Sequence, residues 1–216
     1  MTTSDTSSSS TGATAGTAAN AVLGQTPSQT VGPYFAYGLT PEQYNYPFHS
    51  AFTPVLAQRH ARGTPIRIVG RVFDGAGKTV GDALIEILHA DAEGRPVTSL
   101  EAARASGFSG FGRCGTGTNA EHEFSFQTIK PGAHGPDEAP FVSVIVMMRG
   151  LLLHTFTRLY FEDEAAANER DAVLASVPAE RRHTLIARRE AQTGGEPVYR
   201  FDIHMQGERE TAFFDL

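Results

Sequence analysis

Hydrophobic and polar positions alternate with a period of two in several short segments, and each segment ends at turn-forming residues. In residues 66–72, Ile66, Ile68 and Val72 share one face, and the Asp-Gly pair at 74–75 then turns the chain. Further strands are predicted at 84–90, 123–128, 142–148, 151–160 and 199–206, with a closing edge at 211–214. Many short strands between turns are typical of a β-sandwich, so we expect an all-β fold.

One helical excursion interrupts the strands. Asp163 is a candidate N-cap for a helix that runs to about Leu174. Pro178 suits the first position of a second helix over 179–189, because its missing N–H is not needed there. The second helix would present a solvated basic face made of Arg181, Arg182, Arg188 and Arg189. The Gly-, Ala- and Ser-rich stretch 92–118 is expected to be a long loop.

The chain begins with a segment that differs in composition from the rest. Residues 1–24 consist mainly of Ser, Thr, Ala and Gly, without a basic residue or an apolar block, so we expect a disordered tail and no targeting signal. The remainder, 25–216, is predicted to form one domain. Within it, the Pro- and Tyr-rich arm 26–52 has no sustained helical or strand period. The arm either packs on its own domain or also lines an interface, and the sequence leaves both open.

Charge and cysteine content exclude several classes of partner. The formal net charge of −6 disfavours nucleic acid and anionic membrane surfaces as main partners. No run is long enough to span a membrane. Cys114 is the single cysteine and cannot form an internal disulfide, which fits a reducing compartment, so a cytoplasmic location is expected.

The histidines give no metal or catalytic motif by themselves. None of the eight lies two positions from another, and none forms HExxH. A nucleophile elbow and a phosphate-cradling glycine loop are also missing from the sequence. From the residues alone, the chain is a β-sandwich without a visible catalytic constellation.

Several collinear blocks extend this interpretation. The arm sequence TPSQTVGPY at 26–34 resembles the entry segment of the intradiol ring-cleaving dioxygenases. Further blocks resemble the same family in the same order, at 70–75, 88–94, 128–132, 158–163, 199–203 and 213–216. The resemblance covers about residues 25–216 and implies an intradiol-type sandwich.

The resemblance also implies a ferric site, which this chain does not match. In the family, two Tyr and two His hold Fe(3+), which binds a catechol and makes it reactive towards O2. The corresponding positions here are Pro96, His134, Phe141 and Ser143. Pro and Phe have no donor atom, and Ser is a poor iron ligand. The resemblance therefore implies an alpha-type subunit without a metal site or catalytic residue of its own, whose homologous beta-type partner binds Fe(3+) in an αβ hetero-oligomer.

In such a pair, the alpha-type chain completes the partner's substrate site. The residues that the resemblance assigns to substrate binding are Thr30, Gly32, Pro33, Tyr34 and Arg149. The implied substrate, 3,4-dihydroxybenzoate, is an aromatic carboxylate that a guanidinium can bind by charge-assisted hydrogen bonds. The simpler interpretation of Arg149 is an exposed turn residue before Gly150.

Two other functions remain open at this stage. One is a self-sufficient intradiol dioxygenase, which is disfavoured because the chain has no His-x-His. The other is a non-enzymatic, transthyretin-like binding module, which is disfavoured by the resemblance of the entry arm.

Overall fold

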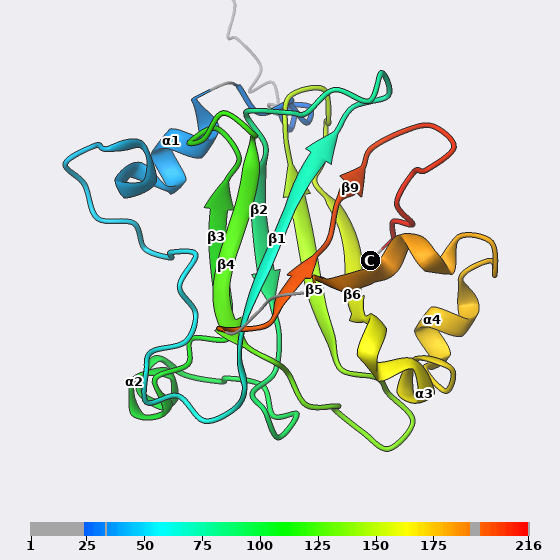
Figure 1. Ribbon diagram of the computed structural model, residues 1–216. Helices are drawn as coiled ribbons and strands as arrows, with labels where there is room; N and C mark the ends of the chain where they lie inside the picture. Colours follow the sequence, from blue (N-terminus) through cyan, green and yellow to red (C-terminus); the bar gives the residue numbers. More distant parts are fainter. Residues whose placement is uncertain (1–23, 33, 191–194, 216) are drawn as a thin grey trace, which may run out of the picture.

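The computed structural model describes residues 24–32, 34–190 and 195–215 (Figure 1). Nine strands in these residues form one curled sheet in the order β3-β2-β5-β6-β7-β8-β1-β4, and β9 pairs with β1. The end strands β3 and β4 come to lie side by side, so that the two halves of the sheet face each other (Figure 1). This confirms the predicted sandwich, with the two halves joined through β7.

The strand bounds agree with most of the predicted segments. The strands are β1 (Pro65–Phe73), β2 (Leu84–Leu88), β3 (Phe111–Gly115), β4 (Glu123–Ile129), β5 (Phe141–Met147), β6 (Thr155–Phe161), β7 (Ile186–Glu190), β8 (Val198–Arg200) and β9 (Ile203–His204). Alternate residues of β5 are buried, and the same holds for most of β4. Phe124, Phe126 and Val144 meet in the core between the two halves, which is the burial expected from the period-two pattern.

The helical segments are all short. They are α1 (Phe35–Leu39), α2 (Leu100–Ser106), α3 (Ala165–Asn168), α4 (Ala172–Ser176) and the 3₁₀ turns η1 (Pro41–Tyr44), η2 (Glu162–Glu164) and η3 (Arg182–Leu185). The longest of them among the described residues has seven residues, so none of these helices could cross a bilayer.

The expected loop at 92–118 was wrong. It contains α2, whose N-terminus is capped by Ser99 Oγ accepting from the Ala102 N–H at 3.0 Å. It also contains β3, which pairs antiparallel with β2. Helix α2 buries none of its residues, so no apolar stripe marked it in the sequence.

The second expected helix, over 179–189, was also wrong. Residues 186–190 form β7, which pairs parallel with β6 and antiparallel with β8. Strand pairing at the junction of the two sheet halves thus overrides the helix propensity of an Ala- and Arg-rich segment. Of the arginines expected on a solvated face, Arg188 and Arg189 are exposed, whereas Arg181 and Arg182 are half-buried.

The first expected helix is broken into η2, α3 and α4, and Asp163 does not cap it. Asp163 instead accepts a hydrogen bond from the Tyr199 hydroxyl at 2.8 Å and pairs with Lys130 at 2.9 Å. The side chain that caps a helix in this region is Asp171, which accepts from the Leu174 N–H at 2.8 Å. The expected edge at 211–214 is reduced to a bridge between Phe156 and Phe214.

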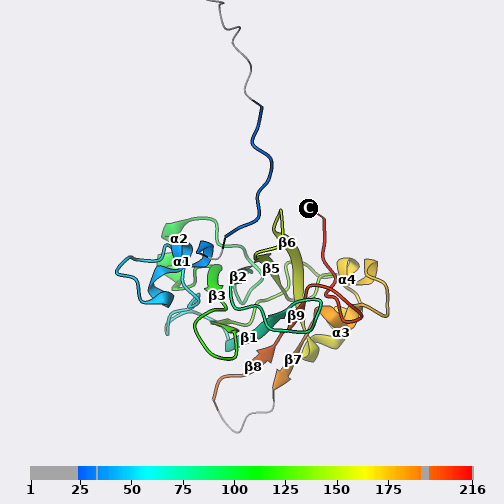
Figure 2. The ribbon, with the colours of Figure 1, turned by 90° about the horizontal axis from the view of Figure 1, so that it is seen from above.

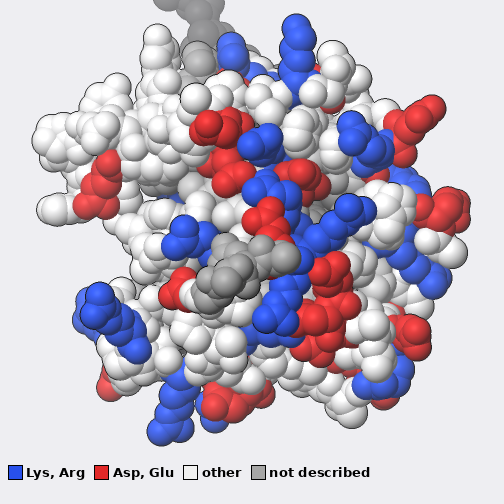
Figure 3. Space-filling view, in the orientation of Figure 1, with Lys and Arg blue, Asp and Glu red and all other residues white. Residues whose placement is uncertain are grey.

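The N-terminal arm approaches the body from outside. Figure 2 shows residues 24–32 as an extended segment, without regular secondary structure, that reaches the sandwich near α1. The tail expected at 1–24 lies, except for Gly24, outside the described residues. On the face drawn in Figure 3, basic and acidic side chains are interleaved over the middle of the sheet.

Candidate functional site

The entry arm and the β5–β6 connection meet at one hydrogen bond. The Gly150 N–H donates to Thr30 Oγ1 over 2.9 Å. Gly150 has a φ of 93°, a left-handed conformation that favours glycine. The glycine at this position therefore favours the turn after β5. The structure thus makes neighbours of Thr30 and the Arg149–Gly150 turn, which are far apart in the sequence.

Arg149 is held by a residue that sequence reasoning missed. Its Nε donates to the carboxylate of Asp82, while the Arg149 side chain remains 60% exposed. A guanidinium has five N–H donors, so the contact fixes the group and leaves donors for a second acceptor. Asp82 lies in the connection that leads into β2, and the sequence offered no signal that this loop lies beside the β5–β6 turn.

A shallow hollow of about 410 Å³ lies beside this pair. It is lined by residues of the 74–82 connection and by Met148, Arg149 and Gly150. Asp74 forms no ion pair with Arg149 in the described residues, and one of its oxygens accepts from the N–H groups of Ala76 and Lys78 within its own turn. The hollow therefore offers an oriented, partly solvated cation.

The rest of the arm is tied to its own domain. Gln43 pairs with the edge of β3: the Gly115 N–H donates to Oε1 at 2.8 Å, and Nε2 donates to the Gly115 carbonyl at 2.7 Å. Tyr37 packs between Tyr34 and Tyr44, with ring centroids 5.7 and 4.4 Å away. Tyr34 itself is 75% exposed. The first alternative, packing on its own domain, holds for this part of the arm, and Tyr34 is left available for another surface.

The two remaining arm residues of the predicted set add little. Gly32 accepts a hydrogen bond from the Phe35 N–H at 3.1 Å, which starts the turn into α1. Pro33 lies outside the described residues. Among the described residues, Thr30 and Arg149 are thus the members of the predicted substrate set that the structure brings together.

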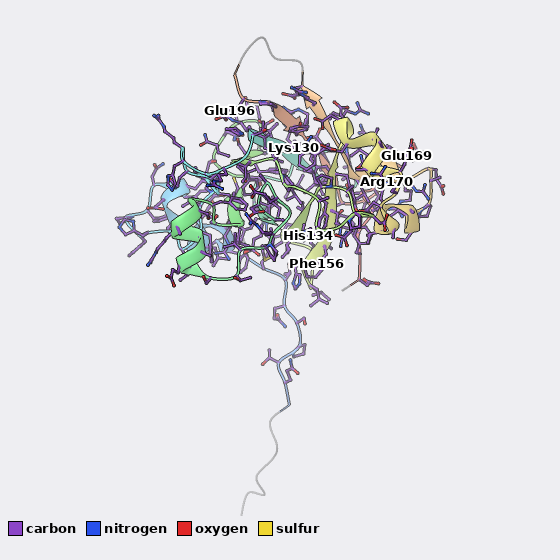
Figure 4. All side chains as sticks on the ribbon, turned by 90° about the horizontal axis from the view of Figure 1, so that it is seen from below. Lys130, His134, Phe156, Glu169, Arg170 and Glu196 are labelled. Carbon is purple, nitrogen blue, oxygen red and sulfur yellow. The ribbon has the colours of Figure 1, made fainter. Side chains whose placement is uncertain are left out.

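The four positions that correspond to iron ligands lie on two neighbouring loops and on β5. The loop that carries Pro96 packs against the loop that carries His134, and the Gly132 N–H donates to the Asp91 carbonyl at 2.9 Å. A Cβ on Gly94 would lie 1.8 Å from the Ala133 carbonyl oxygen, so the close approach of the loops requires glycine. Figure 4 labels His134 together with Lys130, on the segment that follows β4.

An arginine and an aromatic ring lie at the positions that correspond to the iron ligands. The guanidinium carbon of Arg158 lies 4.0 Å from the ring centroid of Phe141, and the His134 ring lies 5.3 Å from the same centroid. Ser143 is the cross-strand neighbour of Arg158. No ion pair involves Arg158 within the described part of the chain.

These residues do not fit a ferric ion. Phe141 and Pro96 supply no donor, and the adjacent guanidinium would repel a cation. The described residues also contain no group of three or more His, Cys, Asp or Glu side chains arranged to hold a metal. Instead of a metal site, the structure has a cation–π contact between Arg158 and Phe141 here, and this contact stabilises the fold without a metal.

A buried carboxylate supports this region from below. Asp171 is 1% exposed and accepts hydrogen bonds from the Tyr160 hydroxyl at 3.0 Å and the Ala139 N–H at 3.0 Å, in addition to its helix cap. Burial raises the pKa of the Tyr160 phenol, so Tyr160 stays neutral and donates to Asp171. Tyr160, which follows Arg158 on β6, is thus held by a buried carboxylate that accepts three hydrogen bonds.

A buried histidine joins the strand ends from which the two loops start. In our assignment, His89 donates from Nδ1 to the Ala90 carbonyl and accepts at Nε2 from the Thr128 hydroxyl, both at 2.8 Å. Burial lowers the pKa of His89 to about 4, so the ring is neutral at pH 7. His89 is therefore a structural residue between β2 and β4, as an isolated histidine usually is.

Known proteins resemble this chain in sequence and in fold. Residues 32–150 match the family model described as Dioxygenase. The chain is 58% identical to the protocatechuate 3,4-dioxygenase alpha chain of Burkholderia cepacia (90% of this chain and 98% of the relative) and 41% identical to that of Pseudomonas putida (again 90% and 98%). It is 32% identical to the beta chain of the Burkholderia cepacia enzyme, over 67% of this chain and 66% of the beta chain.

The fold has solved counterparts as well. The dioxygenase domain of a dioxygenase–carbohydrate-binding fusion protein from Streptomyces superposes with a TM-score of 0.55 at 24% identity, over 77% of this chain and 94% of that domain. At this identity the likeness supports the fold alone. Because the family model covers more than half of the chain and the relatives match almost end to end, the chain belongs to the intradiol dioxygenase family, as a homologue of the protocatechuate 3,4-dioxygenase alpha chains.

Proposed function

We propose that this chain is the subunit of a protocatechuate 3,4-dioxygenase that binds no iron. Its homologous beta-type partner holds the Fe(3+), and the pair cleaves 3,4-dihydroxybenzoate with O2 to 3-carboxy-cis,cis-muconate, placing both oxygen atoms in the product. The observation that carries the proposal is the Arg158 guanidinium 4.0 Å above Phe141, where a metal-binding chain of this family would need a ligand. The match to alpha chains over nearly their full length supports it.

Arg149 and Thr30 define what this chain contributes to the partner's site. When bound by the partner, ferric iron would supply the binding of the catechol oxygens. The guanidinium of Arg149 would bind the ring carboxylate with donors that Asp82 leaves free. Thr30 keeps the arm in place beside that guanidinium through its contact with Gly150. The chain therefore positions the substrate and takes no part in electron transfer.

The exposed apolar side chains support an interface with another chain. Tyr34 and Phe48 in the arm, and Leu152 and Leu153 directly after the Arg149–Gly150 turn, are each at least 66% exposed. Exposed aromatic and aliphatic side chains next to a candidate site are typical of surfaces that a partner covers. We expect the chain to self-associate or to be poorly soluble when it is expressed without its partner. The buried thiol of Cys114 agrees with the cytoplasmic location that we propose.

Co-expression tests the proposal. The chain is produced alone, together with a beta-type chain that has both Tyr and the His-x-His ligands, and the beta-type chain is produced alone. O2 uptake and ring cleavage of 3,4-dihydroxybenzoate are measured for each preparation. We expect full activity from the pair only. Activity of this chain alone would instead support a self-sufficient dioxygenase, and failure to form any complex would support a binding module.

A further inference from the structure

A second cavity lies where β7, β8 and β9 meet the C-terminal segment. Its volume is about 250 Å³, and it shares no lining residue with the hollow beside Arg149. In Figure 1, β9 and the C-terminal segment lie on the right-hand side, away from α2 at the lower left. The charged and titratable side chains that line it are Arg188, Arg200, Arg209, His183, His204 and Asp202. In a chain of net charge −6, such a collection of basic groups needs an explanation.

One of the three arginines is fully compensated. Arg200 forms ion pairs with Glu123 at 2.8 Å and with Glu190, and Asp202 lies 3.8 Å away. Asp202 is itself engaged, since its Oδ1 accepts from the Arg71 N–H at 3.0 Å. Asp202, the carboxylate among the described lining residues, thus lies beside Arg200 and has one oxygen engaged by the backbone of β1.

The other two arginines have no ion pair within the described part of the chain. Arg188 stands directly opposite Arg200 in the antiparallel β7–β8 pair. Like charges at such positions destabilise a sheet, and Glu190 and Glu123 neutralise only Arg200. Arg209, on the segment after β9, is the second uncompensated cation of the lining. The guanidinium groups of Arg188 and Arg209 thus line the cavity without a carboxylate partner among the described residues.

His204 supplies a neutral donor beside them. Its ring stacks on Phe73, with centroids 4.8 Å apart, and its backbone N–H donates to Thr211 Oγ1 at 2.9 Å. Burial, and secondarily the nearby Arg209, lower the pKa of His204. A neutral, fixed imidazole offers a hydrogen bond to an anion without adding charge.

We propose that this cavity is a binding site for a small dianion, with Arg188 and Arg209 as its charged ligands. Two free guanidinium groups match a doubly charged oxyanion, because each can form charge-assisted, bidentate hydrogen bonds. The volume suits inorganic phosphate or a short dicarboxylate, since drug-sized ligands occupy pockets of about 300–1,000 Å³. The inference is independent of the proposed ring-cleaving function, because none of its residues belongs to the set around Arg149.

Titration calorimetry of the full chain tests the site, or of the αβ complex if the chain purifies only in that form. Inorganic phosphate and succinate are titrated separately at constant ionic strength. We expect saturable, one-to-one binding of at least one of them. Arg188→Gln and Arg209→Gln should each weaken it by about ten- to a hundredfold, which is the usual effect of removing a charged hydrogen-bond donor. Arg209→Lys keeps the charge and should retain more of the affinity than Arg209→Gln.

Arg104→Gln is the matched control, because Arg104 is exposed on α2, across the molecule, and has no ion pair in the described residues. Binding of only one probe supports the site and identifies whether its source is phosphate or a dicarboxylate. Equal weakening by the Arg104 control, or a signal that never saturates, would show general counter-ion binding and overturn the proposal. Absence of binding by both probes would also overturn it, and would favour an acidic segment of another protein as the group that covers these arginines.

Discussion

The surface around Arg149 and the region around Phe141 lie on the same sheet and have opposite properties. At the first, an exposed guanidinium is oriented by Asp82 and keeps donors for an external group. At the second, the Arg158 guanidinium lies on an aromatic ring, and the residues beneath it use their hydrogen bonds within the chain. Under the proposed function, the first region binds a group outside the chain, whereas the second stabilises the fold. Substitutions at Arg149 should therefore change catalysis, and those near Phe141 should change stability.

The largest expected effect is on stability, at Asp171. Asp171→Ala removes the acceptor of Tyr160, Ala139 and Leu174, so buried donors lose their partner. We expect the free energy of unfolding to fall by about 3 kcal/mol or more in denaturant titrations. Asp137→Ala is the matched control, because Asp137 is exposed. If Asp171→Ala and Asp137→Ala lowered the free energy of unfolding equally, the buried hydrogen bonds of Asp171 would not be what stabilises this region.

The free energy of unfolding should depend on pH in a way that shows His89 to be buried and neutral in the fold. Its pKa in the fold is about 4, below the ordinary value of 6.5, so the unfolded chain binds a proton before the folded chain does. Its contribution is therefore present above pH 6.5 and declines as pH falls towards 4, by about 3 kcal/mol in total.

His89→Gln should lower stability at pH 7 and remove this part of the slope between pH 6.5 and 4. His60→Gln is the control, because His60 is exposed and forms no ion pair in the described residues, and this variant should keep the part of the slope that His89 produces. Unfolding titrations at several pH values measure both. An unchanged slope in His89→Gln would contradict a buried, neutral His89.

In the iron-bearing complex, Arg149→Ala should act on catalysis alone. We expect KM for 3,4-dihydroxybenzoate to rise about ten- to a hundredfold, with iron content and unfolding free energy unchanged, because a charged contact to the carboxylate is lost. Catechol, which lacks the carboxylate, should be affected less. Steady-state kinetics with both substrates measure the difference. Equal losses for the two substrates would mean that Arg149 does not contact the carboxylate.

The smallest expected effect belongs to Thr30. Thr30→Val removes the acceptor of the Gly150 N–H, a single exposed contact worth about 1 kcal/mol. KM for the carboxylated substrate should rise severalfold, since the arm is less well fixed beside Arg149. Thr30→Ser keeps the hydroxyl and should behave as the unaltered chain. A Thr30→Val variant with unchanged kinetics would exclude the arm contact from substrate binding.

Local pattern predicted the core strands and failed where distant pairing decides the structure. Phe124 and Phe126 alternate with polar residues, and their strand was found correctly. Residues 186–190 have helix-favouring side chains but join the two sheet halves, and nothing in the segment itself reveals the partners. The same limit applies to the site. The residues Thr30 and Arg149 were found by resemblance, whereas Asp82 required knowledge of which loops meet in space.

The most direct test of the account is the iron content per chain, measured by metal analysis and by the colour of the protein. We predict that this chain, produced alone in iron-replete medium, is colourless and holds no stoichiometric iron. The αβ complex should hold one Fe(3+) per αβ pair and show the tyrosinate-to-iron charge-transfer band. A coloured chain with one iron when produced alone would contradict the assignment of Pro96, His134, Phe141 and Ser143 as positions that have lost the metal.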